Sequence, residues 1–216
     1  KFGTLTVTPF NWLEASYFYY RPKELWFDGT PQSAGLYLDK GFNVKLILNQ
    51  DSNLPNIAIG LNDFSGTGYF SSEYVVATQK FEFGKLTGGI GWGEMAGIDS
   101  FSNPLGKLSE TFLSRSSDFD KYGGDVRTER FFKGDSSFFY GAEFFIKPIN
   151  GLTFKIEKDT YDYASVGLGT HDIDVDYQLR KKESKFNYAF SYEVNDYLNL
   201  DLSFIKGNML TLNFTL

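Results

Sequence analysis

The 216-residue sequence contains no cysteine and a single histidine. Without cysteine there can be no disulfide scaffold and no thiolate metal site. Any catalysis by histidine must use His171. No run approaches the roughly 18 apolar residues of a transmembrane helix, so the chain could cross a membrane only as strands. Acidic residues outnumber basic ones, 27 to 21, and no basic stripe is visible, which argues against nucleic-acid binding.

Aromatic residues, in contrast, are abundant: 23 Phe, 14 Tyr and 3 Trp make up 19% of the chain. This is more than a soluble domain needs to fill a core, and such residues are common at membrane interfaces. The first residue is Lys1 rather than Met, and we expect a processed protein or a segment of a longer one.

Hydrophobicity alternates with period two along most of the chain, which predicts strands with one apolar and one polar face. The clearest segments are Leu38 to Leu48, Phe138 to Ile146, Phe186 to Val194, Leu198 to Phe204 and Leu210 to Leu216. Further strands are expected near 2–9, 12–20, 56–62, 73–81, 85–93, 152–160 and 171–180. The total is about twelve strands.

Short and long connections alternate between these strands, which is typical of an up-and-down antiparallel barrel with one decorated rim. A β-sandwich with Greek-key crossovers would not alternate so regularly. We expect one barrel domain over residues 1–216, with the longest connection, residues 94–135, as a rim insertion. Asn103 and Pro104 can start a short amphipathic helix there, as part of the rim or as a plug, and an ordered surface loop is the alternative.

Periodicity alone does not say which face of a barrel points inward. Aromatic residues near strand ends suit a girdle at lipid headgroups, and a barrel of about twelve strands needs a polar lumen, which favours a transmembrane barrel. A soluble lipocalin-like or sandwich domain is the alternative. The predicted lumen and glycan-contact residues are Asp39, Asn43, Lys45, Glu143, Lys155, Glu157, Glu193 and Asp201. The predicted girdle residues are Trp12, Tyr17, Tyr19, Trp92, Tyr188 and Tyr192.

Few groups suggest catalytic or metal chemistry. Asp172, Asp174 and Asp176 resemble the start of a calcium loop, but the glycine and glutamate of an EF-hand are missing, so they are a weak metal candidate. No nucleophile is recognisable near His171. The glycine-rich stretch Gly89 to Gly93 precedes no predicted helix and is no phosphate loop. We therefore expect no cofactor, no metal and no enzymatic activity.

The stretch IGLNDFSGTGYFSSEYVVATQKF, Ile59 to Phe81, followed by LTGGIGWGEMAG, Leu86 to Gly97, resembles the outer-membrane barrel proteins of the YjbH and GfcD type. The resemblance continues through Trp12 to Pro22, Gly35 to Lys45, Ser102 to Arg115 and Arg130 to Tyr163. It implies an outer-membrane location and a role in exopolysaccharide or capsule production, and it supplies no catalytic residues. Members of this family are much longer than this chain.

The resulting hypothesis is a bacterial outer-membrane barrel that acts as a non-enzymatic conduit or scaffold in exopolysaccharide assembly or export. Its expected partners are membrane lipid, polysaccharide and other proteins of the export machinery, with no nucleic acid. Two alternatives stay open: a soluble or surface carbohydrate-binding β domain, and an outer-membrane hydrolase that uses His171 or a lumen carboxylate.

Overall fold

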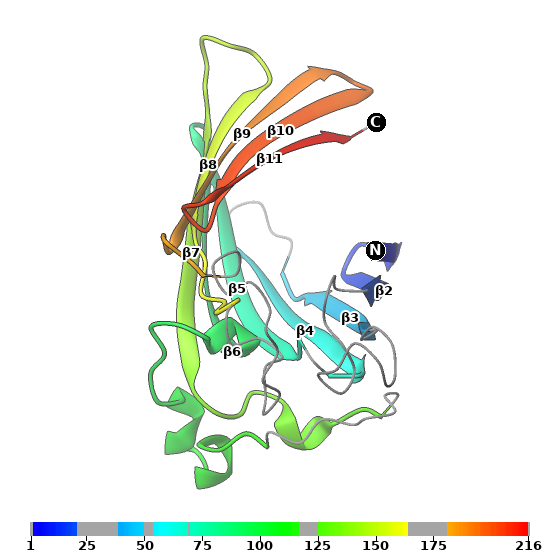
Figure 1. The fold of residues 1–216 in the computed structure, drawn as a ribbon, viewed down its shortest axis with the longest axis vertical. Helices are drawn as coiled ribbons and strands as arrows, with labels where there is room; N and C mark the ends of the chain where they lie inside the picture. Colours follow the sequence, from blue (N-terminus) through cyan, green and yellow to red (C-terminus); the bar gives the residue numbers. More distant parts are fainter. Residues whose placement is uncertain are drawn as a thin grey trace, which may run out of the picture.

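The structure is a computed structural model that describes residues 2–20, 39–49, 54–68, 70–116, 125–163 and 181–215. These residues form one sheet of eleven strands (Figure 1). The strands are β1 (Phe2–Phe10), β2 (Leu13–Tyr20), β3 (Asp39–Ile47), β4 (Asn56–Gly66), β5 (Ser72–Phe81), β6 (Gly84–Gly93), β7 (Ser136–Phe145), β8 (Leu152–Lys158), β9 (Phe186–Asn195), β10 (Leu198–Ile205) and β11 (Met209–Thr215).

Each strand pairs antiparallel with its neighbour in the sequence, so the spatial order from β1 to β11 equals the chain order. This confirms the predicted all-β, up-and-down antiparallel arrangement. The twelfth predicted strand, 171–180, lies outside the described residues, and β8 pairs directly with β9. Among the described strands no ladder joins β1 to β11, so the predicted closure into a barrel is not part of the observed pairing.

The sheet is strongly curved, and the two ends of the strand order lie toward the same side of the view (Figure 1). Two hollows lie on its concave side, one of about 330 Å³ and one of about 570 Å³. Their linings include Lys45, Thr78, Glu143, Lys155 and Glu157, which alternate with the apolar positions of their strands. The polar face of the sheet is therefore its concave wall.

Apolar side chains lie mainly on the opposite, convex face, where they are exposed. Among the described hydrophobic residues only Phe18, Ala58 and Trp92 are buried. The exposed set on the convex face includes Leu5, Tyr17, Phe42, Leu46, Phe138, Tyr140, Tyr188, Phe190, Leu202, Phe204, Leu212 and Phe214. Within the described part of the chain, the sheet encloses no apolar core of the kind that stabilises a water-soluble domain.

The described part of the insertion 94–135 lies at one end of the sheet (Figure 1). It contains four short 3₁₀ helices: η1 (Glu94–Ala96), η2 (Pro104–Lys107), η3 (Glu110–Phe112) and η4 (Thr128–Arg130). At η2 the Asn103 side chain accepts a hydrogen bond from Leu105 N at 3.0 Å, as expected of a capping residue. The helix expected after Asn103 is thus a single 3₁₀ turn rather than an amphipathic α-helix.

The insertion is fixed to the sheet through both backbone and aromatic contacts. Phe101 exchanges backbone hydrogen bonds with Ser136 at 2.8 and 3.0 Å, which adds a bridge to the start of β7. The ring of Phe101 stacks on Phe138 with centroids 4.7 Å apart. This end of the sheet, where β4, β6, β8 and β10 end, is called the decorated rim below.

Candidate functional site

The concave wall carries a row of charges that pair across neighbouring strands. Lys85 on β6 contacts Glu143 on β7 at 2.9 Å, and Lys155 on β8 lies opposite Glu143 in the register. Lys155 in turn lies 3.9 Å from Asp201 on β10. A further pair, Lys45 and Glu14 at 3.2 Å, joins β3 to β2. Positive and negative groups alternate along the row, so the wall is polar with little local net charge.

These wall pairs remain open to solvent, with side-chain exposures between 25% and 42%. Exposed ion pairs of this kind contribute about 0–1 kcal/mol each, because water screens them and two long side chains must be ordered. They therefore add little to folding. Their charged and hydrogen-bonding atoms remain accessible to a ligand in the concave space.

Most of the predicted lumen residues lie on this concave wall. Asn43 donates to the Ser16 hydroxyl at 3.1 Å, and Glu157 accepts from Asn187 at 3.0 Å. Glu193 lies near the hairpin between β9 and β10 and lines a further hollow there. Lys45, Glu143, Lys155 and Asp201 take part in the pairs described above.

Asp39 is the exception among the predicted wall residues. It has no exposed surface, and it accepts a hydrogen bond from the Thr67 hydroxyl at the decorated rim. The turn after β4 covers it, which alternation within β3 could not reveal. The prediction that Asp39 contacts a ligand is therefore wrong.

Five of the six predicted girdle residues lie at the exposed surface. Tyr17, Tyr19, Tyr188 and Tyr192 are on the convex face. Trp12 lies in the turn between β1 and β2, where its ring stacks on Phe10 with centroids 5.2 Å apart. Trp92 is instead 3% exposed, because Phe132 of the insertion packs edge-on against its ring with centroids 5.2 Å apart. The prediction that Trp92 belongs to a surface girdle is wrong.

The weak metal candidate and the single histidine cannot be placed, since Asp172, Asp174, Asp176 and His171 lie outside the described residues. Across the part of the chain that the structure describes, no group of three or more histidine, cysteine or acidic side chains is arranged to hold a metal ion. No helix among the described residues is long and apolar enough to cross a membrane.

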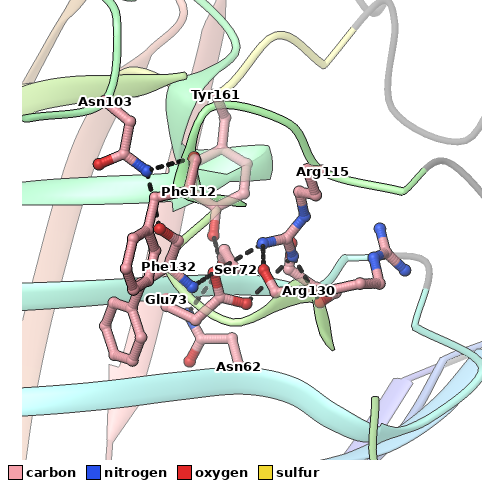
Figure 2. A network of polar contacts seen from close by, with 10 residues as sticks. Asn62, Ser72, Glu73, Asn103, Phe112, Arg115, Arg130, Phe132 and Tyr161 are labelled. Carbon is pink, nitrogen blue, oxygen red and sulfur yellow. Dashed lines mark hydrogen bonds and ion pairs between the residues drawn. The ribbon is translucent and has the colours of Figure 1, made fainter. Parts of the chain in front are cut away.

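A buried ion pair, here called the rim latch, joins Glu73 at the start of β5 to Arg115 in the insertion (Figure 2). The two guanidinium NH₂ groups meet the two carboxylate oxygens at 2.6 and 3.0 Å, a bidentate geometry. Arg115 also donates to the backbone carbonyls of Ser71 and Arg130, and Phe132 N donates to Glu73 at 3.0 Å. Glu73 is 1% exposed and Arg115 is 11% exposed.

Two further polar contacts hold the same region. The amide group of Asn103 donates to the backbone carbonyls of Phe112 and Phe132, at 2.9 and 2.7 Å, and so ties two parts of the insertion together. On the concave side, the Ser72 hydroxyl lies 3.2 Å from the Tyr161 hydroxyl, and burial raises the pKa of Tyr161. The rim latch and these contacts fix the insertion over the ends of β5, β6 and β7.

The sequence contains a weak signal for the rim latch. Glu73 and Arg115 both fall in stretches that resemble the YjbH type, but they are 42 residues apart, and nothing local links them. Glu73 also lies on the apolar face of its strand, where a carboxylate is unusual. A lone charge on an apolar strand face is a sign that a partner must come from elsewhere in the chain.

Beside the rim latch, Glu94 occupies a partly desolvated position. Burial raises the pKa of the Glu94 carboxyl, while the nearby guanidinium groups of Arg115 and Arg130 act in the opposite direction. The direction of the net shift shows that desolvation outweighs the attraction of the two arginines. The charged form of Glu94 therefore costs stability in the folded state.

These observations define a class: an all-β protein with one antiparallel meander sheet, an exposed apolar convex face, a polar concave wall and one rim closed by a latched insertion. The sequence profile described as "Exopolysaccharide biosynthesis protein YbjH" matches residues 1–216. The chain belongs to this YjbH family.

One curated relative is the Escherichia coli K12 protein named "Uncharacterized lipoprotein YjbH". The two are 31% identical over 219 residues, which cover 100% of this chain. The chain spans 30% of the length of that relative. No solved structure shows a significant match to the chain.

We predict that Arg115→Met weakens the rim latch severely. The substitution leaves Glu73 buried without its partner, which typically costs about 3–5 kcal/mol. The midpoint temperature of thermal unfolding should fall, and proteases should cut the insertion faster. Lys107→Met changes an exposed lysine of the same insertion and serves as the matched control. Equal stability of the two variants would contradict the role of the latch.

We predict that Glu94→Gln stabilises the protein at neutral pH. A raised carboxyl pKa means that the folded state binds the proton more tightly than the unfolded state, so charged Glu94 destabilises the fold once the pH exceeds the unfolded value near 4.5. The gain should shrink as the pH falls toward that value. The test is to measure the denaturant midpoint of unfolding across pH, with Glu110→Gln at an exposed site as the control. A gain in stability that is independent of pH would refute the prediction.

Proposed function

We propose that this chain forms part of a bacterial outer-membrane β-barrel that takes part in exopolysaccharide production as a non-enzymatic conduit or scaffold. The observation that carries the proposal is the inverted polarity of the sheet. Large apolar side chains cover the exposed convex face, and polar and charged groups line the concave wall. This is the distribution of a barrel whose outside meets lipid and whose inside holds water.

The energetics of the convex face support a lipid environment. Monomeric soluble proteins rarely expose contiguous apolar patches larger than a few hundred Å². Here exposed leucine, phenylalanine and tyrosine residues recur on strands from both halves of the sheet, β1 and β2 as well as β9 to β11. Each Å² of apolar surface left in water forgoes about 25 cal/mol of transfer free energy, and lipid tails would recover it.

The directions of the edge strands limit how such a barrel could close. Eleven antiparallel strands in chain order make β1 and β11 run the same way, so pairing them directly would create a parallel ladder. An odd number of additional strands between them restores antiparallel pairing throughout and the even count usual for bacterial barrels. We propose that these strands come from outside the described residues, and the greater length of the Escherichia coli relative is consistent with this.

Membership of the YjbH family supports a role in polysaccharide production. The lipoprotein named among the relatives is consistent with an envelope location. The concave wall suits a sugar chain, because its hydroxyl, amide and carboxylate groups can exchange hydrogen bonds with sugar hydroxyls along a path. The proposal assigns no catalytic residue, and the partners would be membrane lipid, the polysaccharide and export-machinery proteins.

The membrane part of the proposal is tested by two substitutions at neighbouring positions of β10. Leu202 faces outward and Ser203 faces the wall. A lysine on the lipid face of a barrel costs about 2–4 kcal/mol near the bilayer midplane, while the wall tolerates charge. Leu202→Lys should therefore reduce the amount of protein recovered in the outer-membrane fraction, and Ser203→Lys should not. Recovery of the wild-type protein without detergent would instead indicate the soluble carbohydrate-binding alternative.

The conduit part is tested by secretion from cells that depend on the protein. Glu143→Ala, Lys155→Ala and Glu157→Ala remove polar groups from the wall without touching the convex face, and together they should lower secreted exopolysaccharide several-fold. Membrane levels of the variant serve as the control. Normal secretion would refute the conduit and leave the scaffold role, and release of cleaved glycan that is lost in His171→Ala would indicate a hydrolase.

A further inference from the structure

Three aromatic side chains of the concave wall lie directly opposite a glycine on the neighbouring strand. The pairs in the register are Phe18 with Gly41, Tyr74 with Gly60, and Phe139 with Gly89. A Cβ atom at any of these three glycines would collide with the facing ring. The glycines therefore provide seats that hold the rings against the wall, as aromatic residues do over glycines in other sheets.

Tyr74 and Phe139 also contact each other across β6. Their ring centroids are 6.3 Å apart and the planes meet at 86°, an edge-to-face arrangement. The residues of β6 that face them are Gly89, which leaves room for the Phe139 ring, and Gly91, over which the Met95 side chain lies. Tyr74 lines the hollow of about 570 Å³ and Phe139 lines the hollow of about 330 Å³. The two rings thus form an aromatic platform where the two hollows adjoin.

Polar groups surround this platform, and the positive charges among them are paired. The hydroxyls of Thr78 and Thr87 lie 3.0 Å apart, and each lines one of the two hollows. The nearby lysines are paired with carboxylates, Lys45 with Glu14 and Lys85 with Glu143. A ligand at the platform meets hydrogen-bonding groups, lysines that are already neutralised, and the Glu157 carboxylate in the smaller hollow. An uncharged polar ligand fits this environment better than a polyanion.

We propose that Tyr74 and Phe139 form a glycan-binding subsite for an uncharged pyranose chain. The C–H face of a pyranose ring would pack on the aromatic platform, and its hydroxyl groups would exchange hydrogen bonds with Thr78, Thr87 and the wall carboxylates. A few polar groups around an aromatic surface are typical of small-molecule sites. The subsite rests on the proposed function, since it names the kind of sugar that the wall would contact.

Calorimetric titration of the purified full chain in detergent tests the subsite. The probes are oligosaccharides made by partial hydrolysis of exopolysaccharide from the producing cells, separated into a neutral and a uronic-acid fraction. We expect the neutral fraction to bind more tightly. No binding of the neutral fraction, or equal or tighter binding of the acidic one, would overturn the proposal.

Four variants locate the binding. Tyr74→Ala and Phe139→Ala should each weaken it about tenfold, and Tyr74→Phe should retain it because the ring is what binds. Gly60→Ala keeps the ring but removes its seat, and should also weaken binding. In the matched control, Gly88→Ala, the added Cβ meets nothing within 4 Å. Circular dichroism verifies folding, and unchanged binding in both Tyr74→Ala and Phe139→Ala refutes the subsite.

The outcome is separable from that of the secretion experiment. Loss of binding in Tyr74→Ala together with normal secretion from the wall variants would retain a glycan subsite and refute the conduit. Secretion that depends on the wall, together with normal binding by both alanine variants, would refute only the subsite.

Discussion

The register between neighbouring strands is the constraint on which the rest of the structure depends. Because side chains alternate with period two, the register decides which residues of neighbouring strands share a face, and it places most polar residues beside polar ones and most apolar residues beside apolar ones. Lys85, Glu143 and Lys155 occupy one row across three strands, and Leu86, Ala142 and Ile156 occupy the next row on the other face. A slip of one residue in a single strand would bring a lysine to the apolar face and a leucine to the polar wall. The polarity of the whole sheet therefore fixes its register.

The same alternation explains how much of the fold could be predicted. Period two is a local signal, and it located all eleven described strands and the residues of each face. It could not show what covers a strand end. Asp39 and Trp92 follow the pattern of their strands, yet one lies beneath a turn and the other beneath Phe132. The partners of Glu73 come from 42 and 59 residues away, so the rim latch depends on tertiary contacts that one sequence does not display.

The charges of the protein fall into two groups with different physical roles. At the decorated rim the Glu73–Arg115 pair is buried, and Arg115 makes hydrogen bonds to one carboxylate, one hydroxyl and two backbone carbonyls, which holds the insertion against the sheet. Those on the concave wall are paired but exposed, and water already competes for them. A ligand can replace that water at little cost. The charges at the rim therefore hold the insertion in place, and the charges on the wall remain accessible to a ligand.

The curvature of the sheet and the aromatic platform both depend on where small and large residues lie on its two faces. The concave side of a bent sheet has less room per residue than the convex side. Concave positions on the central strands include Gly60, Gly89, Gly91 and Gly141, whereas most of the exposed phenylalanine, tyrosine and leucine side chains face outward. Small residues on the concave side let the sheet bend, and the same absence of side chains opens the seats that Tyr74 and Phe139 occupy. A side chain at Gly60 would collide with the Tyr74 ring, and a side chain at Gly89 would collide with the Phe139 ring. The surface offered to a ligand is thus a consequence of how the sheet is able to curve.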